Sequence, residues 1–134
     1  MLTKAPKKLN ILICEDVRQE SGNKISLLGT YVDGIIFTST NDDPNPKMIS
    51  AQLAIFGTFG PLDENCQMKV RILSPDGEVL FETPDHQELK KSDSTTVIAL
   101  KMIGLEFKQQ GKHKLEFNFD KFKVTHGFSV SLAE

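Results

Sequence analysis

Tryptophan is absent from this chain of 134 residues, and tyrosine occurs once, at Tyr31. Proteins that bind carbohydrate or single-stranded nucleic acid usually stack the ligand on several exposed aromatic side chains. The nine phenylalanines fall mostly in phase with apolar positions that are expected to be buried. The aromatic content therefore argues against both classes of ligand.

The chain also lacks an excess of charge of one sign. Sixteen basic and eighteen acidic residues give a net charge of −2, whereas nucleic-acid binding usually needs a basic surface. The apolar run at residues 11–14 is too short for a signal peptide or a membrane span. We expect no nucleic-acid partner and no membrane association.

Cysteine is scarce, with only Cys14 and Cys66 in the chain. Both lie within apolar runs, where a free cysteine behaves as a small buried hydrophobe. A secreted domain of this size usually carries more cysteine. We expect a cytoplasmic protein with free thiols, and a Cys14–Cys66 disulfide is the alternative.

Catalytic motifs are missing as well. The sequence has no glycine-flanked serine nucleophile, no phosphate-binding loop and no paired-histidine zinc helix. His86, His113 and His126 are far apart in sequence, and a zinc site that combines them with the cysteines has no local support. We expect no enzymatic activity, no cofactor and no metal; a metal-dependent enzyme is the least supported alternative.

What the sequence does have is alternation of apolar and polar residues with period two. The clearest examples are residues 115–119 and 122–132, which predict a hairpin with a tight turn near Asp120 and Lys121. No window shows a long helical stripe. The length fits one domain over residues 1–134.

Other strands are expected from the same pattern. Residues 96–107 are nearly continuous in apolar residues and are interpreted as a central strand covered on both faces, with a helix as the alternative. A helical turn is expected at residues 87–90. Further strands are predicted at residues 9–18, 25–32, 49–59, 66–72 and 78–82. About eight strands predict a single antiparallel β-sandwich, immunoglobulin-like or related.

The densest group of charged residues lies at residues 14–18. Glu15, Asp16 and Arg18, together with Tyr31, are candidates for a polar recognition patch. The structural alternative is an Asp16–Arg18 ion pair that pins the first hairpin. On a strand, Cys14 would share one face with Asp16 and Arg18.

The register of that hairpin depends on its turn. A two-residue turn at Gly22 and Asn23 is expected. It would place Asp16 opposite Gly29, and Cys14 opposite Tyr31.

A long polar loop is expected at residues 38–47. Asn41, Asp42 and Asp43 in this loop are further candidate contact residues. Their oxygen atoms suggest a calcium site as an alternative, but turn-forming residues explain the same composition without an ion.

Two segments carry a resemblance. Residues 11–18, Ile-Leu-Ile-Cys-Glu-Asp-Val-Arg, followed by Lys-Ile-Ser-Leu-Leu-Gly-Thr-Tyr at residues 24–31, resemble the start of a family of small bacterial proteins of unknown function. Residues 107–132 are similar to the last hairpin of immunoglobulin-like sandwiches. Neither resemblance implies an activity.

The sequence therefore predicts a non-enzymatic binding or adaptor module that recognises a protein through loops or by strand addition at a sheet edge. The alternative is a self-assembling structural subunit of a phage or bacterial assembly, which forms homo-oligomers through its edge strands.

Overall fold

The computed structural model describes residues 2–38 and 46–133, and in these two ranges it contains strands and no helix. Among these residues there is accordingly no helix of the length and apolar character needed to cross a membrane. The predicted all-β fold is confirmed, with ten strands where about eight were expected. They are β1 (Asn10–Glu20), β2 (Lys24–Thr30), β3 (Gly34–Thr38), β4 (Met48–Phe59), β5 (Cys66–Leu73), β6 (Val79–Glu82), β7 (Gln87–Leu89), β8 (Thr96–Phe107), β9 (Gly111–Phe119) and β10 (Phe122–Ala133).

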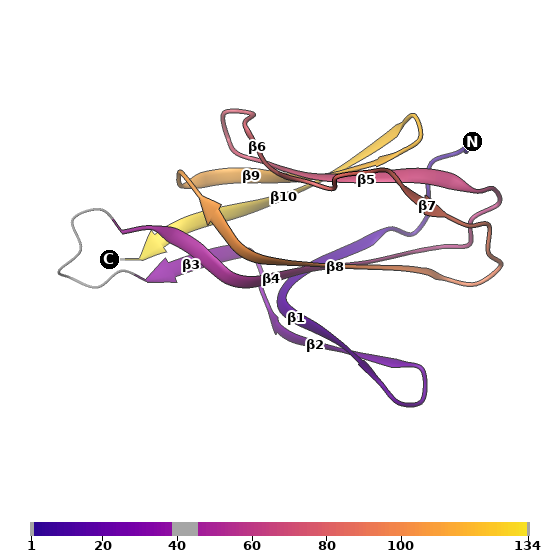
Figure 1. Ribbon diagram of the computed structural model, residues 1–134, viewed down its shortest axis with the longest axis horizontal. Coiled ribbons are helices and arrows are strands. Elements are labelled where there is room, and N and C mark those ends of the chain that lie inside the picture. Colours follow the sequence, from indigo (N-terminus) through magenta and orange to yellow (C-terminus); the bar gives the residue numbers. More distant parts are fainter. Residues whose placement is uncertain (1, 39–45, 134) are drawn as a thin grey trace.

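The strands form two sheets (Figure 1). The first has the order β2-β1-β4-β8, and the second has the order β3-β10-β9-β5-β6, with β7 paired to β5. Both sheets contribute side chains to one core, which is consistent with the predicted sandwich. The expectation of a wholly antiparallel fold is wrong at one edge, where β3 runs parallel to β10. Parallel neighbours need a long connection, and the intervening strands supply it.

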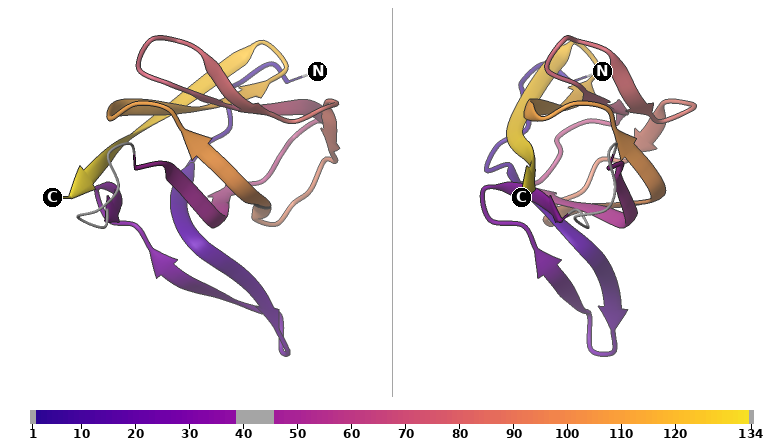
Figure 2. Two further views of the ribbon diagram at one scale, coloured as in Figure 1. Left: turned by 60° about the vertical axis from the view of Figure 1, so that its left-hand side comes forward. Right: turned by 90° about the vertical axis from the view of Figure 1, so that its left-hand side faces the viewer.

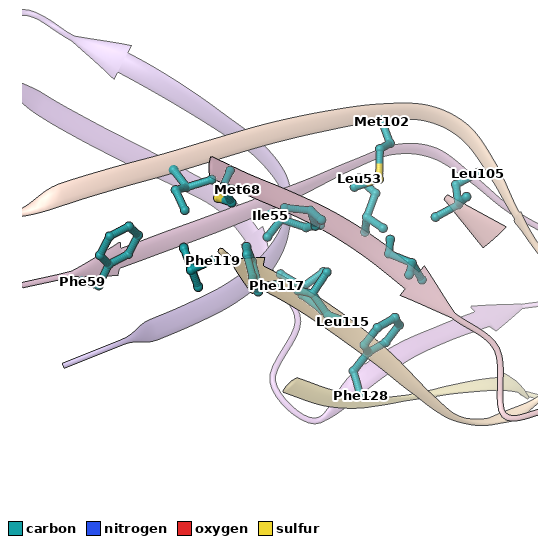
Figure 3. Packing of buried hydrophobic residues seen from close by; sticks show 14 of the residues in the cluster. Leu53, Ile55, Phe59, Met68, Met102, Leu105, Leu115, Phe117, Phe119 and Phe128 are labelled. Atoms are coloured by element: carbon teal, nitrogen blue, oxygen red, sulfur yellow. The ribbon is translucent and has the colours of Figure 1, made fainter. Parts of the chain in front are cut away.

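Alternating apolar residues from the two sheets fill the core (Figure 3). Leu53, Ile55 and Phe59 of β4 face Phe117 and Phe119 of β9, and each of these side chains is at most 1% exposed. The rings of Phe59 and Phe119 meet edge to face with centroids 5.3 Å apart, an arrangement that adds to the burial of apolar area. These contacts join the two sheets.

The predicted C-terminal hairpin is confirmed. Phe119 of β9 pairs with Phe122 of β10 across a two-residue turn. Asp120 occupies this turn with φ 51°, a conformation that aspartate tolerates better than most residues. Its carboxylate accepts hydrogen bonds from the backbone N–H of Leu2 at 2.6 Å and of Gln67 at 3.0 Å. These bonds lower the pKa of Asp120 and tie the N-terminal segment to the second sheet.

The first hairpin has a different register from the predicted one. Asp16 lies opposite Leu28, where Gly29 was expected. The reason is the loop, because Glu20 pairs with Lys24 and three residues connect the strands. One additional loop residue shifts every cross-strand pair by one position.

The same shift places Cys14 opposite Thr30 and not Tyr31. Cys14 lies in the first sheet and Cys66 in the second. Both are buried and free, so the predicted free thiols are confirmed and the alternative of a disulfide between them is wrong.

β8 has the predicted bounds, but it forms an edge of the first sheet and not its centre. Ile103 is 85% exposed, so the prediction of cover on both faces is wrong. The continuous apolar run reflects a change in burial phase along β8. Gly104, which has φ 72°, lies where the buried positions change from even-numbered to odd-numbered residues. Met102 is buried on one side of Gly104 and Leu105 on the other, which breaks simple alternation.

Two short strands were not predicted. β7 replaces the expected helical turn, because its backbone pairs with β5. β3 was not recognised because its five residues depend on pairing with the distant strand β10. Local sequence carries little information about either pairing.

Candidate functional site

The outer part of the β1–β2 hairpin projects beyond the other strands of the molecule (Figure 2). β1 pairs with β4 over residues 10–14. Among the described residues, the part of β1 beyond Cys14 pairs only with β2. We refer to residues 15–29 as the arm. It carries three of the residues nominated from the sequence, Glu15, Asp16 and Arg18.

Glu15 and Gly29 form the base of the arm. Gly29 has φ 63°, and a Cβ atom at this position would lie 2.8 Å from Cδ of Glu15. Gln52 of β4 donates a hydrogen bond from Nε2 to the backbone oxygen of Glu15 at 3.2 Å. The arm is thus joined to β4 at the point where β1 leaves it.

Asp16 is held by two cations. Its carboxylate lies 3.1 Å from Nε of Arg18 and 2.9 Å from Nζ of Lys101 on β8. It also accepts a hydrogen bond from the backbone N–H of Val17 at 2.9 Å. The bonds to Lys101 and Arg18 lower the pKa of Asp16 to about 2. The predicted Asp16–Arg18 pair is confirmed, and Lys101 was missed because it comes from a distant strand.

The face predicted to be shared by Cys14, Asp16 and Arg18 is consistent with the contacts of Asp16. Asp16 bonds to Arg18 and to Lys101, and Lys101 pairs with Ala54, which pairs with Cys14. Cys14 packs with Val17 and Ala54 in a small cluster separate from the main core, whereas Arg18 is exposed.

A recess of about 480 Å³ lies between the arm, β3 and β4. Four of the nominated residues line it together: Glu15, Asp16, Arg18 and Tyr31. The other three nominated residues, Asn41, Asp42 and Asp43, lie outside the described residues. The remaining lining residues are Leu28, Ile35, Ile36, Phe37, Ile49, Ser50, Ala51 and Gln52.

Exposed apolar side chains are the feature of the recess that sequence reasoning missed. Leu28 is 39% exposed, Ile36 67% and Ile49 45%. The buried phase of β4 changes near Ala51, as that of the paired strand does near Gly104. Ser50 is therefore buried and Ile49 faces solvent. A glycine within an apolar strand is the signal that could have revealed this change.

A smaller hollow of about 210 Å³ adjoins the recess. Tyr31 and Ile35 line both. Further lining residues of this hollow include Leu12, Val32 and His126. His126 alternates in step with Val124 and Phe128, which predicts partial burial, and it is partly buried. The hollow is smaller than the roughly 300–1,000 Å³ typical of small-molecule sites, so its size suits one side chain of a larger ligand.

Tyr31 forms the boundary between the two hollows. Its backbone N–H donates to the carbonyl of Ile13 at 2.8 Å, which fixes its position beside β1. Partial burial, with the charge of Glu15 nearby, raises the pKa of the Tyr31 phenol. The neutral hydroxyl is therefore a hydrogen-bonding group at physiological pH.

The histidines and cysteines do not assemble into a metal site. Within residues 2–38 and 46–133, no three or more His, Cys, Asp or Glu side chains are grouped so that they could hold a metal ion. His113 is buried between Phe107 and Phe128. The zinc alternative built from His86, His113, His126 and the two cysteines therefore has no support in the described structure.

Comparison with known proteins supports the predicted resemblance. No protein with a curated description matches the chain. Residues 9–126, which include the arm, β3 and β4, match the model of a family described as a family of unknown function (DUF6941). The chain belongs to this family.

Proposed function

We propose that the protein is a non-enzymatic binding module that recognises an extended segment of a partner protein in the recess between the arm, β3 and β4. The observation that carries the proposal is the set of residues that meet there. Three exposed apolar side chains, Leu28, Ile36 and Ile49, lie beside the charged groups of Glu15 and Arg18. Apolar contacts combined with a polar rim are typical of protein interfaces.

The surrounding strands favour an extended ligand. β3 is at the edge of the second sheet, and three of its residues, Ile35, Ile36 and Phe37, line the recess. A segment lying along this edge could add backbone hydrogen bonds to the side-chain contacts. The smaller hollow beside Tyr31 would receive one anchoring side chain, as deep interface pockets often do.

The low pKa of Asp16 favours a role in recognition over one in acid–base catalysis. Efficient general bases have a pKa near the working pH, whereas that of Asp16 is about 2. Its carboxylate is engaged by Arg18 and Lys101. Asp16 is therefore suited to orient Arg18 at the edge of the recess.

We also place this module in the bacterial cytoplasm, with an immunoglobulin-like arrangement of its sheets. The buried free thiols of Cys14 and Cys66 support a reducing compartment. A second candidate function, a self-assembling structural subunit, is favoured by the free edge of β2.

A library of short random peptides displayed on phage provides the test. Peptides selected on the wild-type protein would be measured by fluorescence anisotropy against Ile36→Lys, which places a charge in the recess. We expect affinity to fall about tenfold or more, the size of an interface hot spot.

Ile103→Lys is the matched control. It makes the same change at another exposed isoleucine, on β8, which is not among the residues that line the recess, although it pairs with Gln52 at the margin. This variant should bind the selected peptides as the wild-type protein does. Equal binding by the Ile36→Lys variant, or selection of no peptide that depends on the recess, would refute the proposal.

A further inference from the structure

β2 forms one edge of the first sheet and, among the described strands, has a partner strand, β1, on one side only. An isolated two-stranded hairpin is marginally stable in water, and three or more strands are usually needed. Pairing with a further strand would therefore stabilise the arm.

The edge carries few of the features that usually prevent pairing between molecules, and Gly29, with φ 63°, is its departure from regular strand geometry. Natural edge strands are often short, interrupted by bulges or proline, or carry charges along their length. β2 has seven residues, KISLLGT, with no proline and a single charge at Lys24. By comparison, β6 at the edge of the second sheet has four residues, and its register with β5 shifts between Ile72 and Leu73.

We infer that two copies of this chain pair through β2, antiparallel and related by a two-fold axis, so that two four-stranded sheets join into one. An antiparallel pair centred on Leu27 uses the full strand. Lys24 of one copy then lies opposite Thr30 of the other, and the remaining pairs involve uncharged residues. Because no like charges face each other, the strand is complementary to itself.

A second copy fits this edge better than an unrelated strand for two reasons. The seven residues match in length, so the edges of both copies are fully paired. The pairing is also isologous and closes at two copies, which leaves no further β2 edge open. The inference does not depend on the proposed function, because it concerns the outer edge of β2 and not the recess.

Sedimentation equilibrium and light scattering over a range of concentrations test the inference. We expect the wild-type mass to approach that of a dimer as concentration rises. Ile25→Lys adds a second positive charge to the edge, and in the paired register this charge lies opposite Gly29 of the other copy, where pairing would remove part of its hydration. The dimer dissociation constant of this variant should increase at least about tenfold.

Two controls keep the outcomes distinct. Ile103→Lys on β8 should dimerise as the wild-type protein does, and so should Ile36→Lys, which tests the recess alone. Amide hydrogen exchange over residues 24–30 should slow with increasing concentration in the wild-type protein. A wild-type mass that stays monomeric at all concentrations, or dimerisation that Ile25→Lys leaves unchanged in a folded variant, would overturn the inference.

Discussion

Gly29 and the side chain of Glu15 occupy adjoining space across the first hairpin: a Cβ atom at position 29 would lie 2.8 Å from Cδ of Glu15. Gly29 also has φ 63°, which L-amino acids with a side chain adopt at a cost of about 1–2 kcal/mol. The base of the arm thus depends on a residue with no side chain.

Gly29→Ala is therefore expected to lower the free energy of unfolding by about 2 kcal/mol, from backbone strain together with the contact to Glu15. Urea denaturation measures the change. In a Glu15→Ala background the same substitution should cost only the strain, so the two effects separate in a double-mutant cycle. Gly77→Ala, with φ 91° and no atom within 4 Å of the added Cβ, is the control for strain alone.

Asp16 predicts a dependence of stability on acid. Its folded pKa of about 2 lies below its ordinary value of 3.8, so its contribution is present above pH 3.8 and is lost as the pH falls towards 2. The stability difference between the wild-type protein and Asp16→Asn should shrink over this interval. Denaturation curves at a series of pH values measure it, and a difference that is constant with pH would contradict the expectation.

Arg18→Ala separates the structural and recognition roles of this residue. Its side chain is 63% exposed, and Asp16 keeps Lys101 as a partner. Exposed ion pairs contribute little to stability, so the melting temperature should change little while affinity for recess-binding peptides falls. A large loss of thermal stability with unchanged peptide affinity would assign Arg18 to the fold.

Burial of His113 leads us to expect a second loss of stability on acidification, at a higher pH than the loss caused by Asp16. Its ring lies between Phe107 and Phe128, Nδ1 is 3.1 Å from the backbone oxygen of Gly111, and Nε2 is buried without a hydrogen-bond partner among the described residues. Burial lowers the pKa of His113 below 6.5, since the charged ring would lose its hydration.

The direction of this stability change follows from the difference in proton binding between the folded and the unfolded chain. The unfolded chain binds a proton at His113 more readily than the folded one, so stability is retained above about pH 6.5 and falls below it, by up to about 1.4 kcal/mol per pH unit. His113→Phe should flatten this part of the curve. His86 and His126 are unchanged in that variant, so an equally steep curve would show that another group is responsible.

The thiols of Cys14 and Cys66 should be protected in the folded protein. Both are buried, and burial raises the pKa of each thiol, which lowers the fraction of reactive thiolate. We expect no reaction with Ellman's reagent under native conditions and release of both thiols in denaturant. Rapid reaction of either thiol before unfolding would show that the local packing opens.

The parts of the structure that could be predicted are those encoded by neighbouring residues. Alternation located the hairpin of β9 and β10, and the spacing of Asp16 and Arg18 indicated their ion pair. β3 escaped notice because its pairing with β10 is not a local property. The apolar side of the recess was missed in part because Ile36 lies on β3, and in part because the exposure of Ile49 depends on a change in the buried phase of β4 near Ala51, which alternation alone does not reveal.

The parallel pairing of β3 with β10 sets an order of events during synthesis. Residues 34–38 leave the ribosome long before Ser129 and its neighbours, with which they pair. Until then, Ile35 and Phe37 lack the strand that will hold them, and contacts so distant in sequence form slowly. The second sheet therefore completes this edge only after residues 129–133 have emerged, and until then the apolar side chains of the segment are open to non-native contacts.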